Sequence, residues 1–132
     1  MMHDEIILRL LPARVNADDR LCWRGRHVNT TFLLESGTAQ YLISIEKGRI
    51  SSVSKSAGHP DSYRFALRAD ESVWGSFWQS HPAPGYHDIM ALIKFKRLKA
   101  EGDLYPLMSH LLYFKDVLAA VRDVPQPAGV HA

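Results

Sequence analysis

One residue pattern that could perform acid–base chemistry is the adjacent pair His87-Asp88, with His110 as a third group farther along the chain. A histidine titrates near neutral pH, and a carboxylate beside it can orient the ring for proton transfer. The fold would have to bring His110 to the pair, because sequence separation alone does not. The chain has seven histidines but no HExxH motif and no Cys-His spacing typical of zinc. The pattern leaves a small isomerase or hydratase as an alternative function and predicts no metal site.

Nucleophilic and nucleotide-dependent chemistry have little support in the sequence. Cys22 has Arg20 and Arg24 nearby, which could activate a thiol, but a structural cysteine is the favoured interpretation. Because neither a Gly-x-Gly-x-x-Gly motif nor a Walker loop occurs, no cofactor is predicted, and no catalytic residue is assigned. A serine nucleophile also has little support, because no Gly-x-Ser-x-Gly motif surrounds Ser51, Ser52, Ser72 or Ser76.

Apolar and aromatic side chains are the stronger candidates, and they indicate ligand binding. Trp74, Phe77 and Trp78 lie within five positions, which gives one helix face a large aromatic area. Met90 and Met108 have flexible thioether side chains that fit irregular ligands. The alternative for all of them is an ordinary core between helix and sheet. The predicted ligand-binding residues are Trp74, Phe77, Trp78, Ile89, Met90, Ile93, Met108, Leu111 and Leu112.

Four basic residues are interleaved with two apolar ones between positions 94 and 99. An anionic membrane surface would attract such a cluster, and a lipid carrier must touch a membrane to load its ligand. A solvated face is the alternative. The net charge of +2 is too small to indicate a polyanionic partner, so no nucleic acid is predicted. The residues predicted to contact a membrane transiently are Lys94, Lys96, Arg97 and Lys99.

The composition is that of one globular domain. Of the 132 residues, 46% are hydrophobic and 23% are charged, a balance that allows a real core and argues against wholesale disorder. The single cysteine, Cys22, cannot form an intramolecular disulfide, so a reducing compartment is expected. The chain starts acidic at Asp4-Glu5, and Pro12 stops its short apolar patch, so neither a secretory signal nor a membrane span is expected. We therefore expect a cytoplasmic protein.

Alternating β-favouring residues predict a sheet in the middle of the chain. Lys47-Gly48 marks a tight turn, because glycine takes a positive φ at little cost. The first four strands, joined by short connections, predict an antiparallel meander whose apolar face helices must cover. The strands are expected at 30–34, 41–45, 49–54, 63–67 and 98–101.

Helices at 70–78, 88–93 and 104–121 are expected to supply that cover. Asp70 and Asp88 have the side chain that is preferred at a helix N-cap. The last helix is expected to bury an apolar stripe at helical spacing, with Lys115 as its one polar member. The stripe comprises Leu104, Leu107, Met108, Leu111, Leu112, Lys115, Leu118 and Ala119. Residues 1–27 are expected to form an arm, 28–124 the domain itself, and 125–132 a flexible tail.

The order of these elements resembles the sterol carrier protein family, also called nonspecific lipid-transfer proteins. The resemblance is carried by the turn at 46–48 and by a strand with Lys99 that ends in Gly102-Asp103 before the last helix. It covers about residues 28–121. It implies an α+β fold: a five-stranded, mainly antiparallel sheet covered by helices, with an apolar cavity for fatty acyl chains, sterols or similar lipids. It also implies no catalytic residues.

The chain departs from this pattern in the Pro-rich segment 81–85 and in the basic arm before Val28, and both could shape the mouth of a cavity. Together the observations predict a small cytoplasmic lipid-binding carrier for a fatty acyl, sterol-like or isoprenoid ligand. Two alternatives stay open. One is an isomerase or hydratase that uses the same cavity, and the other is a protein-interaction domain that assists lipid or quinone metabolism. A homodimer is a further expectation.

Overall fold

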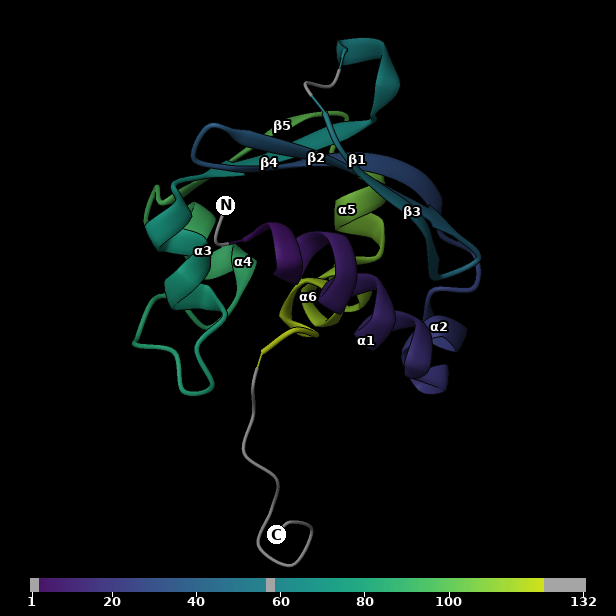
Figure 1. The fold of residues 1–132 in the computed structure, drawn as a ribbon, viewed down its shortest axis with the longest axis horizontal. Helices are drawn as coiled ribbons and strands as arrows, with labels where there is room; N and C mark the ends of the chain where they lie inside the picture. Colours follow the sequence, from purple (N-terminus) through teal and green to yellow (C-terminus); the bar gives the residue numbers. More distant parts are fainter. Residues whose placement is uncertain (1–2, 57–58, 123–132) are drawn as a thin grey trace, which may run out of the picture.

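The computed structural model describes residues 3–56 and 59–122, and helices cover one face of its five-stranded sheet (Figure 1). The tail expected at 125–132 lies outside the described residues. The strands are β1 Asn29–Ser36, β2 Ala39–Glu46, β3 Arg49–Lys55, β4 Phe65–Ala69 and β5 Leu98–Gly102. The helices are η1 Ile6–Leu10, α1 Leu11–Ala17, α2 Asp19–Arg24, η2 Pro60–Ser62, α3 Glu71–Phe77, α4 Ile89–Lys94, α5 Tyr105–Ser109 and α6 Leu111–Ala119.

The order of the strands is β3-β2-β1-β4-β5, and every neighbouring pair is antiparallel except β1 and β4. The predicted α+β class with a five-stranded, mainly antiparallel sheet is therefore confirmed. The predicted meander of four strands was wrong, because β4 pairs in parallel with β1 and not with β3. The physical reason is burial: Phe65, Ala66 and Leu67 are all fully buried, as in a strand with neighbours on both sides. β3, by contrast, is mostly exposed and forms an edge.

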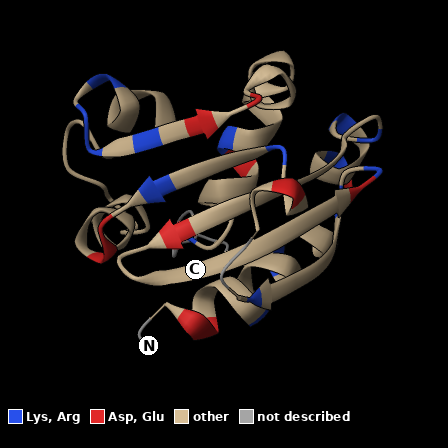
Figure 2. Ribbon diagram, turned by 90° about the horizontal axis from the view of Figure 1, so that it is seen from above, with Lys and Arg blue, Asp and Glu red and all other residues tan. Residues whose placement is uncertain are grey.

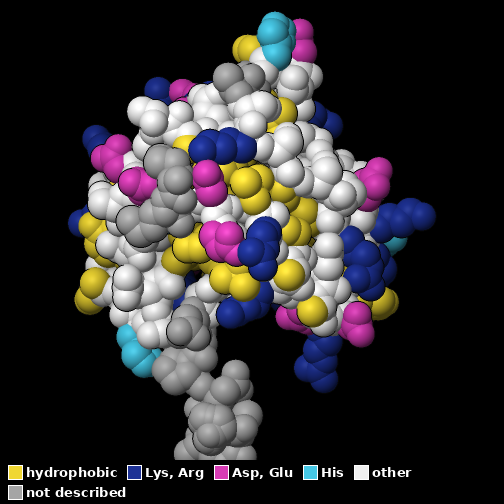
Figure 3. All heavy atoms as spheres, in the orientation of Figure 1, with side chains coloured by type: hydrophobic (Ala, Val, Ile, Leu, Met, Phe, Trp, Pro, Cys, Tyr) yellow, Lys and Arg dark blue, Asp and Glu magenta, His cyan; other side chains and the backbone are white. Residues whose placement is uncertain are grey.

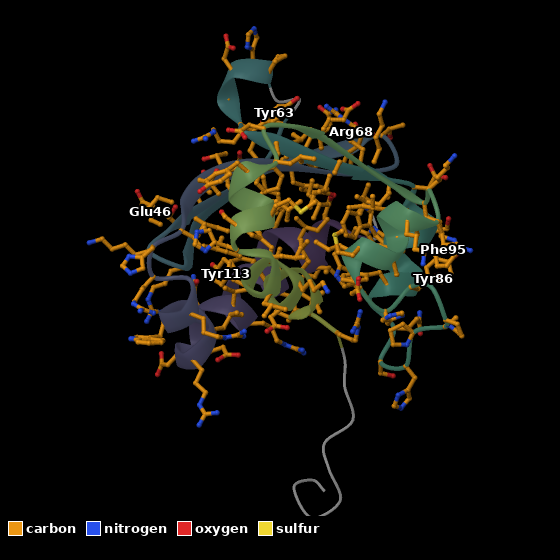
Figure 4. The ribbon with its side chains drawn as sticks, turned by 180° about the vertical axis from the view of Figure 1, so that it is seen from behind. Glu46, Tyr63, Arg68, Tyr86, Phe95 and Tyr113 are labelled. Atoms are coloured by element: carbon orange, nitrogen blue, oxygen red, sulfur yellow. The ribbon has the colours of Figure 1, made fainter. Side chains whose placement is uncertain are left out.

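Ion pairs between charged side chains link three strands on the outer face of the sheet. Arg68 on β4 donates to Glu35 on β1 and to Glu101 on β5, both at 2.7 Å, and to the Tyr63 hydroxyl at 3.2 Å. Figure 2, which looks onto this face, shows the alternating charges on neighbouring strands, and Figure 4 shows Tyr63 and Arg68 side by side. Lys99 and Arg68 lower the pKa of Glu101 by hydrogen bonding to its carboxylate. The polar outer face leaves the opposite face to form the core.

The N-terminal helices belong to that core. Ile7, Leu11 and Val15 of η1 and α1 are fully buried in one apolar cluster with the inner face of the sheet. The side chain of Asn16 accepts from the backbone N–H of Ile50 at 2.8 Å and donates to its carbonyl at 2.9 Å. Residue 16 thereby uses backbone groups that the edge strand β3 would otherwise leave unpaired. The arm thus packs on the sheet of its own chain.

The last helix is divided in two, which corrects the prediction of one helix from 104 to 121. His110 separates α5 from α6 and has φ −129° and ψ 40°, values outside the helical region. The break changes the phase of the apolar stripe. Tyr113, Phe114 and Val117 are buried in place of the predicted Leu112, which is 69% exposed. The physical reason is that the turned α6 can place the Phe114 ring against the inner face of the sheet.

Candidate ligand-binding site

The aromatic side chains of α3 lie together in the interior. Trp74 and Phe77 are fully buried and Trp78 nearly so, and the two indole rings stack with centroids 5.3 Å apart. The indole N–H of Trp74 donates to the carbonyl of Glu35, and that of Trp78 to the carbonyl of Leu118, both at 2.8 Å. Because both polar groups are satisfied by backbone, the rings offer only apolar surface to a neighbour.

Helix α4 places its predicted residues at one edge of this interior. Asp88 accepts from the backbone N–H of Ala91 at 3.0 Å, so the predicted cap is present. Ile89 is fully buried, whereas Met90 and Ile93 are half-buried. Ile93 lines a surface hollow of about 620 Å³ between α4, β4 and β5. The hollow is also lined by Glu35, Gly37, Arg68, Ala69, Asp70, Lys96, Arg97, Leu98, Lys99 and Ala100.

The predicted residues of the last two helices lie elsewhere, at the surface. Met108 is 46% exposed, Leu112 is exposed still more, and Leu111 is half-buried. With Arg24 and Tyr113 they line a separate hollow of about 450 Å³. The nine predicted ligand-binding residues therefore divide into an inner group on α3 and α4 and an outer group on α5 and α6.

The inner face of the sheet contributes aromatic residues that the prediction did not assign to the site. Phe32 and Phe65 are register partners on β1 and β4, and their rings stack 5.2 Å apart at an interplanar angle of 2°. Phe114 of α6 meets both rings edge-on, at 5.8 and 5.6 Å. The alternation of Phe32 with Leu34 and of Phe65 with Leu67 was the available signal, because residues two apart share a sheet face.

A buried polar pair borders the α3 aromatic residues. His3 is 2% exposed and Ser36 fully buried, and the two share a hydrogen bond of 2.7 Å. The His3 ring meets Trp78 edge-on at 5.2 Å, and a Cβ added at Gly75 would lie 3.9 Å from its Nε2. Burial lowers the pKa of His3, and the carboxylate of Glu71 opposes this effect only in part. The interior therefore favours the neutral form of His3.

Acidification should destabilise the protein through His3. Below its ordinary pKa of 6.5, the histidine takes up a proton in the unfolded chain while burial resists protonation in the fold. The free energy of unfolding should fall as the pH drops below that value, until the lowered pKa of the folded state is passed. Urea unfolding at pH about 7.5 and about 5.5 measures the loss, which His3→Gln should reduce. An equal loss in His3→Gln would assign the effect to other groups.

The residues of the acid–base alternative do not meet in one place. His87 Nε2 lies 3.6 Å from Asp88 Oδ2, and Lys115 Nζ lies 3.9 Å from the same oxygen. His110 instead lines a hollow with His27 and Tyr105. Within the described part of the chain, no three histidine, cysteine or acidic side chains are grouped to hold a metal ion.

The four predicted membrane-contact residues lie at the end of α4, in the turn that follows it and in β5. Lys94, Lys96 and Lys99 are exposed and Arg97 is half-buried. Lys99 pairs with Glu101 at 2.9 Å. Among residues 3–56 and 59–122, no helix combines the length and hydropathy that are needed to cross a bilayer.

Solved structures of low sequence identity share this arrangement of strands and helices. A crystal structure of sterol carrier protein 2 matches with a TM-score of 0.71 at 11% identity, over 91% of this chain and 96% of that one. This chain has the sterol-carrier fold. A conserved hypothetical protein from Thermus thermophilus, described as possibly a sterol carrier protein, matches with a TM-score of 0.65 at 12% identity, over 92% of this chain and 90% of the other.

A third protein with the sterol-carrier fold is a ubiquinone synthesis protein described as UbiJ-SCP2. It matches with a TM-score of 0.62 at 15% identity, over 91% of this chain and 96% of that one. The sequence itself matches no protein-family model and no curated protein. At these identities the likeness establishes the fold alone, because one fold can support unrelated functions.

Proposed function

We propose that this chain is a small cytoplasmic lipid-binding carrier that holds a fatty acyl, sterol-like or isoprenoid ligand between its sheet and its helices. The observation that carries the proposal is the apolar interior of a sterol-carrier fold. Among the described residues, His3 and Ser36 are the only buried polar ones, and nearly all of the buried hydrophobic side chains form one apolar core. The cytoplasmic location rests on the single cysteine.

The layer of helices is suited to admit such a ligand. Apart from η1 and α1, which follow each other without a break, each of its helices has between five and nine residues. Apolar contacts are not directional, so a segment such as α4, which has no side-chain hydrogen bond to a strand among the described residues, can shift on the sheet without losing specific bonds. A ligand would gain about 25 cal/mol per Å² of apolar area buried, before the costs of association and of displacing core contacts. Recognition by apolar area favours a class of lipids over one compound.

Hydrophobic side chains reach the surface where this interior is thinly covered. Figure 3 shows them across the middle of the face on which η1 lies, surrounded by charged residues. Ile6, Leu8 and Leu10 of η1 are packed against the core but only partly buried. Ile93 of α4 is likewise packed against the core but only partly buried, and it lines the hollow beside β4 and β5. The ubiquinone synthesis protein with the same fold supports an isoprenoid member of the proposed ligand class.

Native mass spectrometry of the purified protein tests the proposal directly. Spectra under gentle conditions should contain a mass increment that denaturing conditions release, and that matches a fatty acid, sterol-like or quinone species. A clean apo mass, with no change in tryptophan fluorescence on addition of long-chain lipids, would overturn the proposal. The same spectra give the oligomeric state, which tests the expected homodimer.

Ile93→Asp should weaken lipid binding at least about tenfold, because a carboxylate at the edge of an apolar site must be desolvated. Leu112→Asp is the matched control, since it makes the same change in the outer group of predicted residues. Binding is followed by the fluorescence of Trp74 and Trp78 in a Trp23→Phe background, because Trp23 is 63% exposed. A larger loss in Leu112→Asp would move the site to α5 and α6.

One observation favours a second candidate function, a protein-interaction domain that assists lipid or quinone metabolism. Large apolar side chains are exposed on α2, α5 and α6: Trp23, Tyr105, Met108 and Leu112. Scattered apolar residues are common on surfaces, but Met108 and Leu112 line one hollow, and neighbouring exposed apolar residues are typical of an interface. A clean apo mass together with a dimer that Leu112→Asp dissociates would favour this candidate.

A further inference from the structure

We infer that the turn at residues 94–97 docks the protein onto an anionic lipid bilayer, with Phe95 inserted among the head groups. The turn joins α4 to β5 at the edge of the molecule, where Figure 4 shows Phe95 beside Tyr86. The inference goes beyond the proposed function, because vesicle binding requires no lipid inside the protein. Either can fail while the other stands.

The backbone holds this turn in one defined shape. The N–H of Arg97 donates to the carbonyl of Leu92 at 2.8 Å, and the N–H of Lys96 to that of Ile93 at 3.0 Å. These are the two bonds of a Schellman motif, whose left-handed position is here Lys96 with φ +60°. Glycine is the usual residue at that position because it has no Cβ. The chain instead has a cation there, at the tip of the turn.

The side chains of the turn present an aromatic ring surrounded by positive charge. Phe95 is 54% exposed. The Lys94 ammonium lies 5.8 Å and the Arg97 guanidinium 5.4 Å from its ring centroid. Arg97 also covers the Tyr86 ring at 4.6 Å. An aromatic ring with neighbouring basic residues is the composition of peripheral membrane contacts, in which the ring enters the interface and the cations attract anionic head groups.

The positive charges of the turn are not neutralised by the residues that the structure describes. Within the described residues, no carboxylate lies within ion-pair distance of Lys94, Lys96 or Arg97. The nearby Lys99 differs, because it pairs with Glu101. Asp70 and Glu35 line the adjoining hollow, and Glu35 is engaged by Arg68. A surface dense in phosphate groups would provide the counter-charges that the turn lacks.

Co-sedimentation of the full chain with vesicles tests the inference. The protein should bind vesicles of phosphatidylcholine containing one-third phosphatidylglycerol, should not bind pure phosphatidylcholine vesicles, and should bind more weakly at high salt. Each basic residue near such a surface contributes about fivefold in affinity, so K94Q/K96Q should weaken binding about 25-fold. Phe95→Ser should remove the part of the binding that resists salt.

Two variants separate docking from net charge and from folding. R20Q/K47Q removes two exposed cations that lie in no ion pair of the described residues, so its loss should be small. Lys96→Gly should raise the urea midpoint while it weakens vesicle binding about fivefold. The inference is overturned if the wild type ignores phosphatidylglycerol, if R20Q/K47Q loses as much as K94Q/K96Q, or if Lys96→Gly binds unchanged.

Discussion

Gly48→Ala should lower the free energy of unfolding by about 2–5 kcal/mol. Gly48 has φ +82°, a conformation that costs any residue with a Cβ. An added Cβ would overlap the backbone oxygen of Cys22 and lie 2.7 Å from the carbonyl carbon of Gly25. Both obstacles are backbone atoms of α2 and its C-cap, so no side-chain rotation can make room. The turn between β2 and β3 would have to move away from α2.

Gly37→Ala is the matched control, because Gly37 also has a left-handed backbone, with φ +64°. The nearest atom to its added Cβ would be Glu71 Cβ at 3.8 Å, an ordinary contact distance. The loss there should be about 1–2 kcal/mol, the cost of the conformation alone. Urea unfolding followed by tryptophan fluorescence measures both variants. Equal losses at the two positions would show that the close approach to α2 does not constrain the turn.

The turn at 47–48 also shows what local sequence can and cannot predict. The dipeptide predicted a tight turn, which the structure contains, because glycine's freedom is a property of the residue itself. The close packing around it depends on segments far apart in the chain. The Tyr113 hydroxyl of α6 donates to the carbonyl of Gly48 at 2.7 Å, and burial raises the pKa of Tyr113. No local pattern contains that contact.

The same difference between local and distant determinants explains why the strands of the sheet were predicted but their order was not. All five strands were predicted, since features visible within each segment, such as β-favouring residues and flanking turn signals, are enough to indicate a strand. The pairing of β4 was not, because a short continuous apolar run fits several positions in a sheet. The place of β4 in the sheet is decided by burial: between β1 and β5, the strand has a neighbour on each edge, and Phe65, Ala66 and Leu67 are covered on both faces.

Buried residues of the candidate site could be predicted from helical spacing only where the helix is uninterrupted. Trp74 and Phe77 lie within a single uninterrupted helix, so their helical spacing placed them correctly on its buried face. The stripe through Met108 and Leu112 assumed that the helix continues past His110. The break there leaves both side chains at the surface. Pro106 did not indicate the break at His110, because proline is tolerated in the first turn of a helix.

Phe114→Ala should destabilise the protein by about 3–5 kcal/mol, a large share of the about 5–15 kcal/mol that a domain of this size commonly has. Phe114 is fully buried, and it is the ring of α6 that meets the stacked pair of Phe32 and Phe65 on the sheet. Its removal would separate helix from sheet by a cavity that neighbouring aromatic rings cannot easily fill. Urea unfolding provides the measurement.

Phe95→Ala makes the same chemical change at a ring that is 54% exposed, so its loss should stay within about 1 kcal/mol. A comparable loss at both positions would show that the Phe114 ring does not hold the layers together. If a lipid occupies the space between sheet and helices, it should fill part of the cavity left by Phe114→Ala. Saturating lipid should then stabilise Phe114→Ala more than the wild type, because tighter binding to the folded state raises the free energy of unfolding further.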